Sequence, residues 1–364
     1  MTYSLNDICL TPAKISRVEH RGDCNPYNVD QMLPLFTAPM NSIVDENNYE
    51  TFLKNKINTI IPRGVDYGKR LELSTKTFVA LGLDEFESFI SDCPTTPDSV
   101  DCTYYICVDV ANGHMKRLID LCSKAKVAFG SHLILMAGNI ANPETYADYA
   151  IAGVDFIRVG IGGGSVCLTS ANGGVHYGMG SLIKHVADKS YAVREVIRSS
   201  LAMGLSCPYR SVPLIVADGG FDNYDKIIKA LALGADYVMI GKLFAQCEEA
   251  CGKILTYTRT SDQPLDKELK WLFDSKHEIY QAKFRHYYGM STKKAQVETG
   301  RTKLRTSEGI KVNVPILYSL EAWCENFIDY LRTAMSYTDS FNLDEFKETE
   351  YTIISPLEYL SYYK

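Results

Sequence analysis

A thiol inside a glycine-rich turn is the feature of this chain best suited to covalent chemistry. Residues 159–169 read Val-Gly-Ile-Gly-Gly-Gly-Ser-Val-Cys-Leu-Thr and follow an apolar run. Glycines after a strand let backbone N–H groups converge on an anion, and the Ser165 hydroxyl can join them. The Cys167 thiol would lie among N–H dipoles that favour the nucleophilic thiolate, and Thr169 can reach the same reacting atom. A glycine-rich turn alone is a weak sign, because a tight strand-to-helix turn needs glycine without any ligand.

Two later segments complement this loop. Asp218 precedes Gly219 and Gly220, so a carboxylate suited to a ribose diol is followed by backbone that can donate to phosphate. Taken alone, Asp218 fits a helix N-cap equally well. Gly241 and Lys242 can extend the phosphate site. Together these groups predict a site for a nucleoside monophosphate.

These residues all follow short apolar runs that predict buried parallel strands. The intervening segments 115–129, 143–152 and 223–233 have helical spacing, and several end in glycine before the next run. Eight runs give the simplest strand count: Leu35–Ala38, Ile57–Ile61, Tyr104–Val110, Leu133–Ala137, Phe156–Val159, Leu214–Ala217, Tyr237–Ile240 and, less clearly, Phe284–Tyr288.

The positions of the polar residues favour a (β/α)₈ barrel, also called a TIM barrel, over a doubly wound sheet. Polar or glycine-rich residues follow six different strands, which is where barrel enzymes build their sites. A doubly wound sheet would gather its ligand groups at one switch point. The α/β class with a single catalytic barrel domain over residues 1–364 is therefore expected, and the length of 364 residues fits it.

Several segments depart from the strand-helix rhythm. Residues 181–213 are longer than a barrel repeat needs, and Lys253–Gln281 is interpreted as a charged helical insertion without strand character. Residues 292–314 are expected to form a mobile flap after strand 8, and residues 316–364 a helical tail. The stretch between Ile61 and Asp109 is too short to hold a regulatory tandem domain.

Composition excludes several classes of partner. A net charge of −6 gives no basic field for nucleic acid, so a nucleotide would need a local site. The eleven cysteines are scattered through apparent strands and helices, as free thiols in a reducing compartment are. No secretory leader, polybasic anchor or membrane-spanning run is found, so a soluble, cytoplasmic protein is expected.

The order and spacing of these motifs resemble the IMP dehydrogenase / GMP reductase family from about Ser4 to Pro315. The loop Gly-Ser-Val-Cys-Leu-Thr, followed by an Asp-Gly-Gly strand end, is the most specific part. The other matching motifs are Thr37-Ala38-Pro39-Met40, Val108-Asp109-Val110-Ala111-Asn112-Gly113-His114, Met136-Ala137-Gly138-Asn139, Met239-Ile240-Gly241, Tyr288-Gly289-Met290-Ser291 and Ser307-Glu308-Gly309.

The resemblance implies a role for each matching residue. Cys167 would attack carbon 2 of a purine nucleotide to form a thioimidate, beside a nicotinamide cofactor. Asp109 would face the nicotinamide riboside, and Arg63 and Asn112 are assigned to the same cofactor. The carbonyls of Gly162, Gly164 and Cys167 would bind a potassium ion, and relatives form homotetramers. The residues expected to bind the nucleotide are Ser165, Asp218, Gly219, Gly220, Gly241, Lys242, Met290, Ser291, Arg305, Ser307 and Gly309.

The flap favours the reductase branch of the family. Dehydrogenases activate water with an Arg-Tyr pair there, and Gln296–Thr306 contains no such pair. Reductases use a Thr-Glu pair to handle the proton of the departing ammonia, and Thr169 and Glu308 match it. The chain is therefore expected to reduce GMP to IMP and ammonia with NADPH.

Other functions stay open from the sequence. A short IMP dehydrogenase would oxidise IMP to XMP with NAD, and residues 170–178 and Pro62-Arg63 differ from the reductase pattern. A non-catalytic purine nucleotide-binding barrel is disfavoured because Cys167, Thr169 and Glu308 are all present. A flavin-phosphate barrel is disfavoured by the nucleophilic loop.

Overall fold

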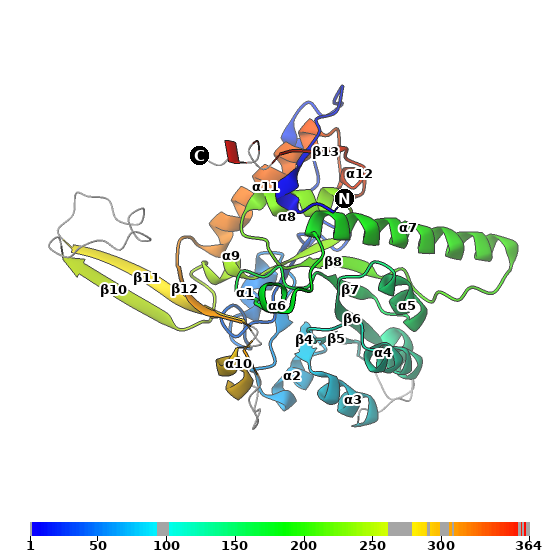
Figure 1. Cartoon of the computed structure of the whole chain (residues 1–364), viewed down its shortest axis with the longest axis horizontal. Coiled ribbons are helices and arrows are strands. Elements are labelled where there is room, and N and C mark those ends of the chain that lie inside the picture. The colour runs from blue at the N-terminus through cyan, green and yellow to red at the C-terminus, as the bar shows by residue number, and fades with distance from the viewer. Residues whose placement is uncertain are drawn as a thin grey trace.

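Eight short parallel strands form the centre of the molecule (Figure 1). The structure is a computed structural model that describes residues 2–92, 102–260, 279–289, 292–298, 306–307, 309–355, 358 and 360–361. In sheet order the eight strands are β2 (Leu35–Thr37), β9 (Tyr237–Ile240), β8 (Leu214–Asp218), β7 (Phe156–Val159), β6 (Leu133–Ile140), β5 (Tyr104–Val108), β4 (Phe78–Leu81) and β3 (Ile60–Ile61).

The two outer strands of this series meet, so the sheet closes into a barrel. Phe36 of β2 pairs in parallel with Asn58, just before β3. The Thr37 amide donates to the Asn58 carbonyl at 2.9 Å, and the Asn58 amide donates to the Leu35 carbonyl at 3.1 Å. The predicted (β/α)₈ barrel is therefore confirmed.

Aromatic side chains fill one end of the barrel. Phe78, Phe156 and Tyr237 each begin a strand, and with Phe36 they form a cluster of tilted and edge-on ring pairs with centroids 5.0–5.9 Å apart. This packing seals the end where the strands begin. Polar groups of the barrel interior are thereby confined to the opposite end, where the strands finish.

Helices surround the strands as the sequence predicts. Asn223 caps one of them with its side chain, and Gly153 ends another in the left-handed conformation, with φ of 84°. The helices are α1 (Tyr49–Lys54), α2 (Tyr67–Leu73), α3 (Leu83–Asp92), α4 (Lys116–Phe129), α5 (Thr145–Ala152), α6 (Thr169–Gly173), α7 (Met179–Met203), α8 (Tyr224–Ala232) and α9 (Lys242–Ala245), with short 3₁₀ turns at Leu5–Asp7, Arg21–Asp23 and Gly130–His132.

Two of the predicted strand assignments are wrong. The third barrel strand is β4, which the prediction omitted, and the run Phe284–Tyr288 lies outside the barrel. That run belongs to β11 (Ile279–Tyr288), which pairs antiparallel with β10 (Ile254–Thr260) and β12 (Lys311–Pro315). The charged side chains Lys283 and Arg285, in and beside this run, suit an antiparallel ribbon better than a buried barrel strand.

The β10–β11 arm also corrects the prediction for Lys253–Gln281. Residues 254–260 are a strand rather than part of a helical insertion, and the arm projects from one side of the barrel (Figure 1). Its sequence Ile-Leu-Thr-Tyr-Thr-Arg-Thr is rich in residues that favour strands. Of the expected flap, the described part holds α10 (Lys293–Glu298) and the start of β12.

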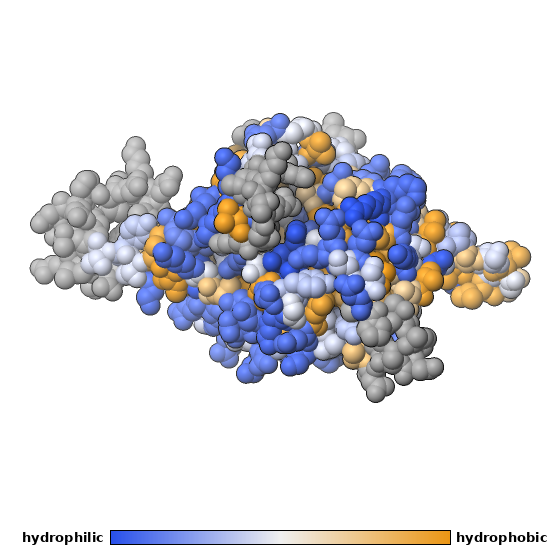
Figure 2. All heavy atoms as spheres, turned by 90° about the horizontal axis from the view of Figure 1, so that it is seen from below, coloured by the Kyte–Doolittle hydropathy of each residue, from blue (hydrophilic) through white to orange (hydrophobic). Residues whose placement is uncertain are grey.

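The opposite side of the molecule carries the long helix α7 (Figure 1). Its last buried residue is Val193, and beyond it Val196, Leu201 and Met203 are exposed. This end forms an apolar tip in the space-filling view (Figure 2). The insertion predicted over residues 181–213 is thus largely a helix extending beyond the barrel.

The tail packs back on the start of the chain. Helices α11 (Leu320–Tyr337) and α12 (Leu343–Phe346) lead to β13 (Tyr351–Ile353), which pairs antiparallel with β1 (Ile8–Leu10). Trp323 and Phe327 of α11 are buried. In the described residues, no helix is both long and apolar enough to cross a membrane.

Candidate functional site

The loop that follows β7 presents Cys167 and Thr169 to each other. The Cys167 thiol donates to the Thr169 hydroxyl oxygen at 3.3 Å. The turn is closed by the Cys167 amide, which donates to the Gly164 carbonyl at 2.9 Å. Thr169 begins α6, so the thiol lies between a glycine turn and the start of a short helix. The Thr169 hydroxyl, expected to reach the same reacting atom as the thiol, is thus in contact with Cys167.

Glycines in this loop allow backbone to contact backbone. A Cβ on Gly163 would lie 3.2 Å from the Gly219 carbonyl oxygen, and a Cβ on Gly160 would collide with the Asp218 carbonyl. Gly162 has φ of 76°, and a side chain there would collide with the Ser170 hydroxyl. The loops after β7 and β8 therefore pack closely only because both carry glycine.

The segment after Glu308 lies across the thiol loop. Cys167 forms an antiparallel bridge with Gly309, and the Ile310 amide donates to the Val166 carbonyl at 3.0 Å. The Ser307 hydroxyl donates to the Gly309 carbonyl at 2.7 Å. The structure therefore brings Ser307 and Gly309 to the Cys167 loop, from more than a hundred residues further along the chain.

Tyr287 is a site residue that the sequence reasoning missed. It lies on β11, its side chain is hydrogen bonded to Ser165, and a Cβ on Gly241 would lie 2.6 Å from its hydroxyl oxygen. Burial raises the pKa of Tyr287 to about 12, so its hydroxyl stays a hydrogen-bond donor at neutral pH. Three groups from three segments, namely Ser165, Gly241 and Tyr287, thus meet at the predicted phosphate position.

Arg158 is the second residue that was missed. It lies within β7 and is buried, and its guanidinium contacts Asp109 Oδ1 at 2.7 Å and Asp218 Oδ2 at 2.8 Å. Asn139 Nδ2 donates to the same Asp218 oxygen at 2.7 Å and to the Gly160 carbonyl at 2.9 Å. A charged residue inside a run of buried strand residues was the signal that could have identified it.

The residues assigned to the cofactor differ in their surroundings. Asp109 joins the Arg158 network at the end of β5. Asn112 accepts from the amide of His114, two residues later, and so stabilises its own turn. Arg63 lies against Gly82, and its Nε is 3.5 Å from the Glu85 carboxylate. Asp109 thus follows β5, whereas Arg63 follows β3 and contacts the loop after β4, the strand that lies between them.

Some predicted residues cannot be located. Met290, Ser291, Arg305 and Glu308 lie outside the described residues. Lys242 begins α9 directly after Gly241, at the carboxyl end of β9. Gly219 and Gly220 follow β8 with φ of 108° and 87°. The described candidates therefore gather at the carboxyl ends of the strands, as expected for a barrel site.

Comparison with known proteins agrees with this arrangement. Residues 98–263 match the model of the IMP dehydrogenase / GMP reductase domain. This stretch of the chain is therefore similar to the IMP dehydrogenase / GMP reductase domain. Over 243 residues it is 29% identical to a GMP reductase of Caenorhabditis elegans and 30% identical to one of Onchocerca volvulus. It is also 29% identical to GMP reductase 2 of Homo sapiens.

These similarities cover part of each protein. Each match spans 66% of this chain, and it spans 56% of the two nematode proteins and 58% of the human protein. The chain thus aligns with little more than half the length of the GMP reductases it resembles. The matched residues 98–263 include Cys167, Thr169, Asp109, Arg158 and Asp218.

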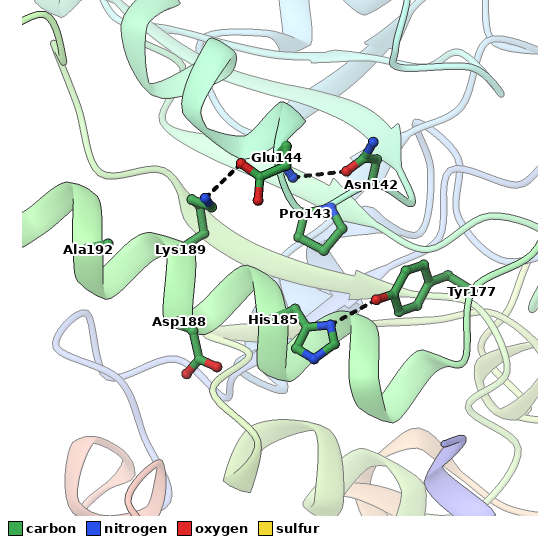
Figure 3. A pocket seen from close by; sticks show the side chains of 8 residues that line it. All are labelled: Asn142, Pro143, Glu144, Tyr177, His185, Asp188, Lys189 and Ala192. Atoms are coloured by element: carbon green, nitrogen blue, oxygen red, sulfur yellow. Dashed lines mark hydrogen bonds and ion pairs between the residues drawn. The ribbon is translucent and has the colours of Figure 1, made fainter. Parts of the chain in front are cut away.

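A shallow groove of about 490 Å³ lies between the start of α5 and helix α7 (Figure 3). The Tyr177 hydroxyl is 2.9 Å from His185 Nδ1, and Lys189 Nζ is 2.7 Å from the Glu144 carboxylate. These polar groups of the groove therefore pair with one another. The groove is lined by Asn142, Pro143, Glu144, Tyr177, His185, Asp188, Lys189 and Ala192.

Metal ligands of the acidic, histidine or cysteine type do not gather in the described part of the domain. No group of three or more such side chains could hold an ion there. The turn at 162–167 offers backbone carbonyl oxygens, which are ligands of another type. Carbonyl oxygens of this kind suit a potassium ion.

Proposed function

We propose that the chain is a GMP reductase that converts GMP to IMP and ammonia with NADPH, through a covalent bond between Cys167 and carbon 2 of the purine. The contact between Cys167 and Thr169, at 3.3 Å, carries this proposal. It places a proton acceptor beside the thiol, in the loop that the family match includes. The similarity to named GMP reductases supports the choice of substrate.

The first half of the reaction uses the residues of the thiol loop. Cys167 loses its proton toward Thr169, and its sulfur forms a bond to carbon 2 of the base. The bond from carbon 2 to the amino nitrogen then breaks, and the nitrogen leaves as ammonia with a proton supplied through Thr169 and Glu308. The bridge between Cys167 and Gly309, the residue after Glu308, supports that pairing.

The second half of the reaction reduces carbon 2 and frees Cys167 from the purine. NADPH, when bound, would provide the hydride for carbon 2; the carbon–sulfur bond would then break and return the thiolate of Cys167. GMP, NADPH and two protons thus give IMP, NADP⁺ and an ammonium ion. We assign the nicotinamide riboside to Asp109 and the rest of the cofactor to Asn112 and Arg63, because a carboxylate and a guanidinium suit a ribose diol and phosphates, respectively.

The nucleotide would be held by the groups that converge around Ser165. The hydroxyls of Ser165 and Tyr287 and the N–H groups of Gly219, Gly220 and Gly241 suit a phosphate. Asp218 suits the ribose diol, because the described donors reach only its Oδ2 oxygen and Oδ1 can accept from a ligand. Lys242, Met290, Ser291, Arg305, Ser307 and Gly309 complete the proposed contacts.

We also propose a potassium ion at the carbonyls of Gly162, Gly164 and Cys167. Gly162 adopts φ of 76°, a conformation that turns its peptide away from the regular strand direction. An ion there would fix the turn that carries the thiol. The resemblance to the family further supports a homotetramer that works in the cytoplasm.

Nicotinamide absorbance tests the proposed reaction. The protein should oxidise NADPH when GMP is added and should release ammonia in equal amount. Reduction of NAD with IMP, without NADPH oxidation by GMP, would instead identify an IMP dehydrogenase. Tight binding of purine nucleotides without turnover of either pair would indicate a non-catalytic barrel.

Glu308→Gln tests the proton step. The variant should slow ammonia release much more than it weakens GMP binding, because the carboxyl acts on the leaving group. Equal effects on kcat and on GMP affinity would instead mean that Glu308 only positions the substrate. Thr169→Val should resemble Glu308→Gln if the two side chains act together.

A further inference from the structure

One buried guanidinium joins the two carboxylates of the site. Arg158 Nη1 contacts Asp109 Oδ1 at 2.7 Å, and Nη2 contacts Asp218 Oδ2 at 2.8 Å. The side chain of Arg158 is 7% exposed, and each carboxylate is 17% exposed. The three side chains therefore form one chain of charged groups across the mouth of the barrel.

This chain of groups spans strands that are not neighbours. Asp109 follows β5, Arg158 lies on β7, and Asp218 ends β8, with β6 between β5 and β7. Asn139, near the end of β6, donates to Asp218 and so connects this intervening strand to the same network. A movement of one carboxylate is therefore transmitted to the other through a single planar group.

Among the donors in the described residues, none reaches the second oxygen of either carboxylate. Arg158 Nη1 is bound to Oδ1 of Asp109. On Asp218, the donors from Arg158 and Asn139 all reach Oδ2. The remaining oxygen of each carboxylate can accept a hydroxyl, while the guanidinium fixes the plane of both groups.

The guanidinium of Arg158 stays protonated in spite of its burial. Burial alone would lower the pKa of Arg158, but the negative charges of Asp218 and Asp109 raise it well above its usual value. The guanidinium consequently stays charged at every working pH. Removing it would leave two poorly hydrated carboxylates facing each other without a counter-charge.

We propose that Arg158 is a positioning residue that couples the nucleotide site to the dinucleotide site by holding Asp218 and Asp109 at once. The inference rests on the proposed function, which gives Asp218 the ribose of GMP and Asp109 the riboside of the cofactor. Binding of either ligand orders its carboxylate and, through Arg158, orders the other carboxylate as well. The second ligand then binds at a lower entropic cost.

Arg285 provides a matched control, because it is also a buried arginine with multiple contacts. Its guanidinium binds carbonyl oxygens rather than carboxylates: Ala245 at 2.8 Å, Glu248 at 3.0 Å and Gly252 at 3.2 Å, with Cys247 as a further partner. Arg285→Lys therefore disturbs a buried arginine without touching either site carboxylate.

The experiment measures the Kd of GMP by calorimetry, with and without saturating NADP⁺, which cannot donate a hydride. In the unmodified protein NADP⁺ should lower the Kd of GMP by about fivefold or more, as in other coupled sites. In Arg158→Lys, a single ammonium can hold only one carboxylate. The Kd of GMP alone should therefore stay within about threefold of its value in the unmodified protein. The coupling factor, which is the Kd of GMP without NADP⁺ divided by the Kd with NADP⁺, should fall to about one. Arg285→Lys should keep the coupling factor.

Arg158→Met extends the test by removing the charge, and circular dichroism shows whether it folds. Folded Arg158→Met should lose coupling and also bind each ligand more weakly than Arg158→Lys does. An unchanged coupling factor in Arg158→Lys, or no coupling in the unmodified protein that binds both ligands, overturns the inference while leaving the proposed function intact. Failure of the unmodified protein to bind GMP or NADP⁺ at all overturns the proposed function and this inference with it.

Discussion

The mouth of the barrel and the far end of α7 are opposite in character. At the mouth, the charged side chains of Asp109, Arg158 and Asp218 are mostly shielded from water and paired with one another. At the end of α7, the apolar side chains of Leu201 and Met203 are exposed, at 75% and 64%. The contrast locates the chemistry: polar groups held in a fixed arrangement belong to the site, and the helix extension lies outside it.

Removing the Cys167 thiol, at the mouth of the barrel, should lower activity more than any other change. Cys167→Ala should lower turnover of GMP by a factor on the order of 10⁴ or more, because a covalent nucleophile is lost. Binding of GMP should remain measurable by calorimetry. Cys207→Ala, in the connection after α7, serves as the control and should keep full activity. Retained turnover in Cys167→Ala would overturn the covalent mechanism.

The backbone of the thiol loop should be the next most sensitive feature. Gly162→Ala adds a Cβ at φ of 76° that would collide with the Ser170 hydroxyl, so the loop must shift. A displacement of about 1 Å can lower kcat roughly a hundredfold. Gly173→Ala is the matched control, because a Cβ there meets nothing within 4 Å. Equal kcat values in the two variants would show that the loop tolerates the shift.

Tyr287→Phe should have a smaller effect, on binding rather than on chemistry. Loss of one hydrogen bond at the proposed phosphate position should raise the KM for GMP about tenfold with kcat nearly unchanged. Burial raises the pKa of Tyr287 to about 12, so the hydroxyl keeps its proton and the ratio of KM values should be the same at pH 7 and pH 9.

Tyr257→Phe, on the exposed face of the β10–β11 arm, should leave the KM unchanged and is the control for Tyr287→Phe. A fall in kcat for Tyr287→Phe without a change in KM would instead assign its hydroxyl to the chemical step. A KM ratio that disappears above pH 8 would contradict the raised pKa of this residue.

The smallest effect is expected at the end of α7. Leu201→Ser with Met203→Ser should change the free energy of unfolding by no more than about 0.5 kcal/mol, because neither side chain is buried. Steady-state kinetics should match those of the unmodified protein. A marked loss of kcat in this variant would break the separation between the site and the extension.

The sequence was informative where local rules and tertiary structure agree. The barrel, its helices and the gathering of Cys167, Thr169, Asp218 and Gly241 at the strand ends follow from short buried runs ended by polar or glycine residues. The strand β4 was missed because Phe78-Val79-Ala80-Leu81 is a short apolar run, which periodicity alone cannot assign to a strand or a helix.

Long-range pairing accounts for the other errors. β11 alternates in a way that predicts a strand, but its partner lies in residues 254–260, which were assigned to a helical insertion. The alternating, Thr-rich run at 254–260 was the available signal. Arg158 and Tyr287 were missed because they are internal to strands, and only the closed barrel and the arm bring them to Asp218 and Ser165.

The most direct test of the central claim is the mass of the protein after incubation with GMP in the absence of NADPH. A covalent adduct should form that adds the mass of GMP less one molecule of ammonia, and peptide mapping should locate it on Cys167. Addition of NADPH should then remove the adduct and release IMP. An enzyme that oxidises NADPH with GMP but never carries an adduct on Cys167, even after rapid quenching, would contradict the account.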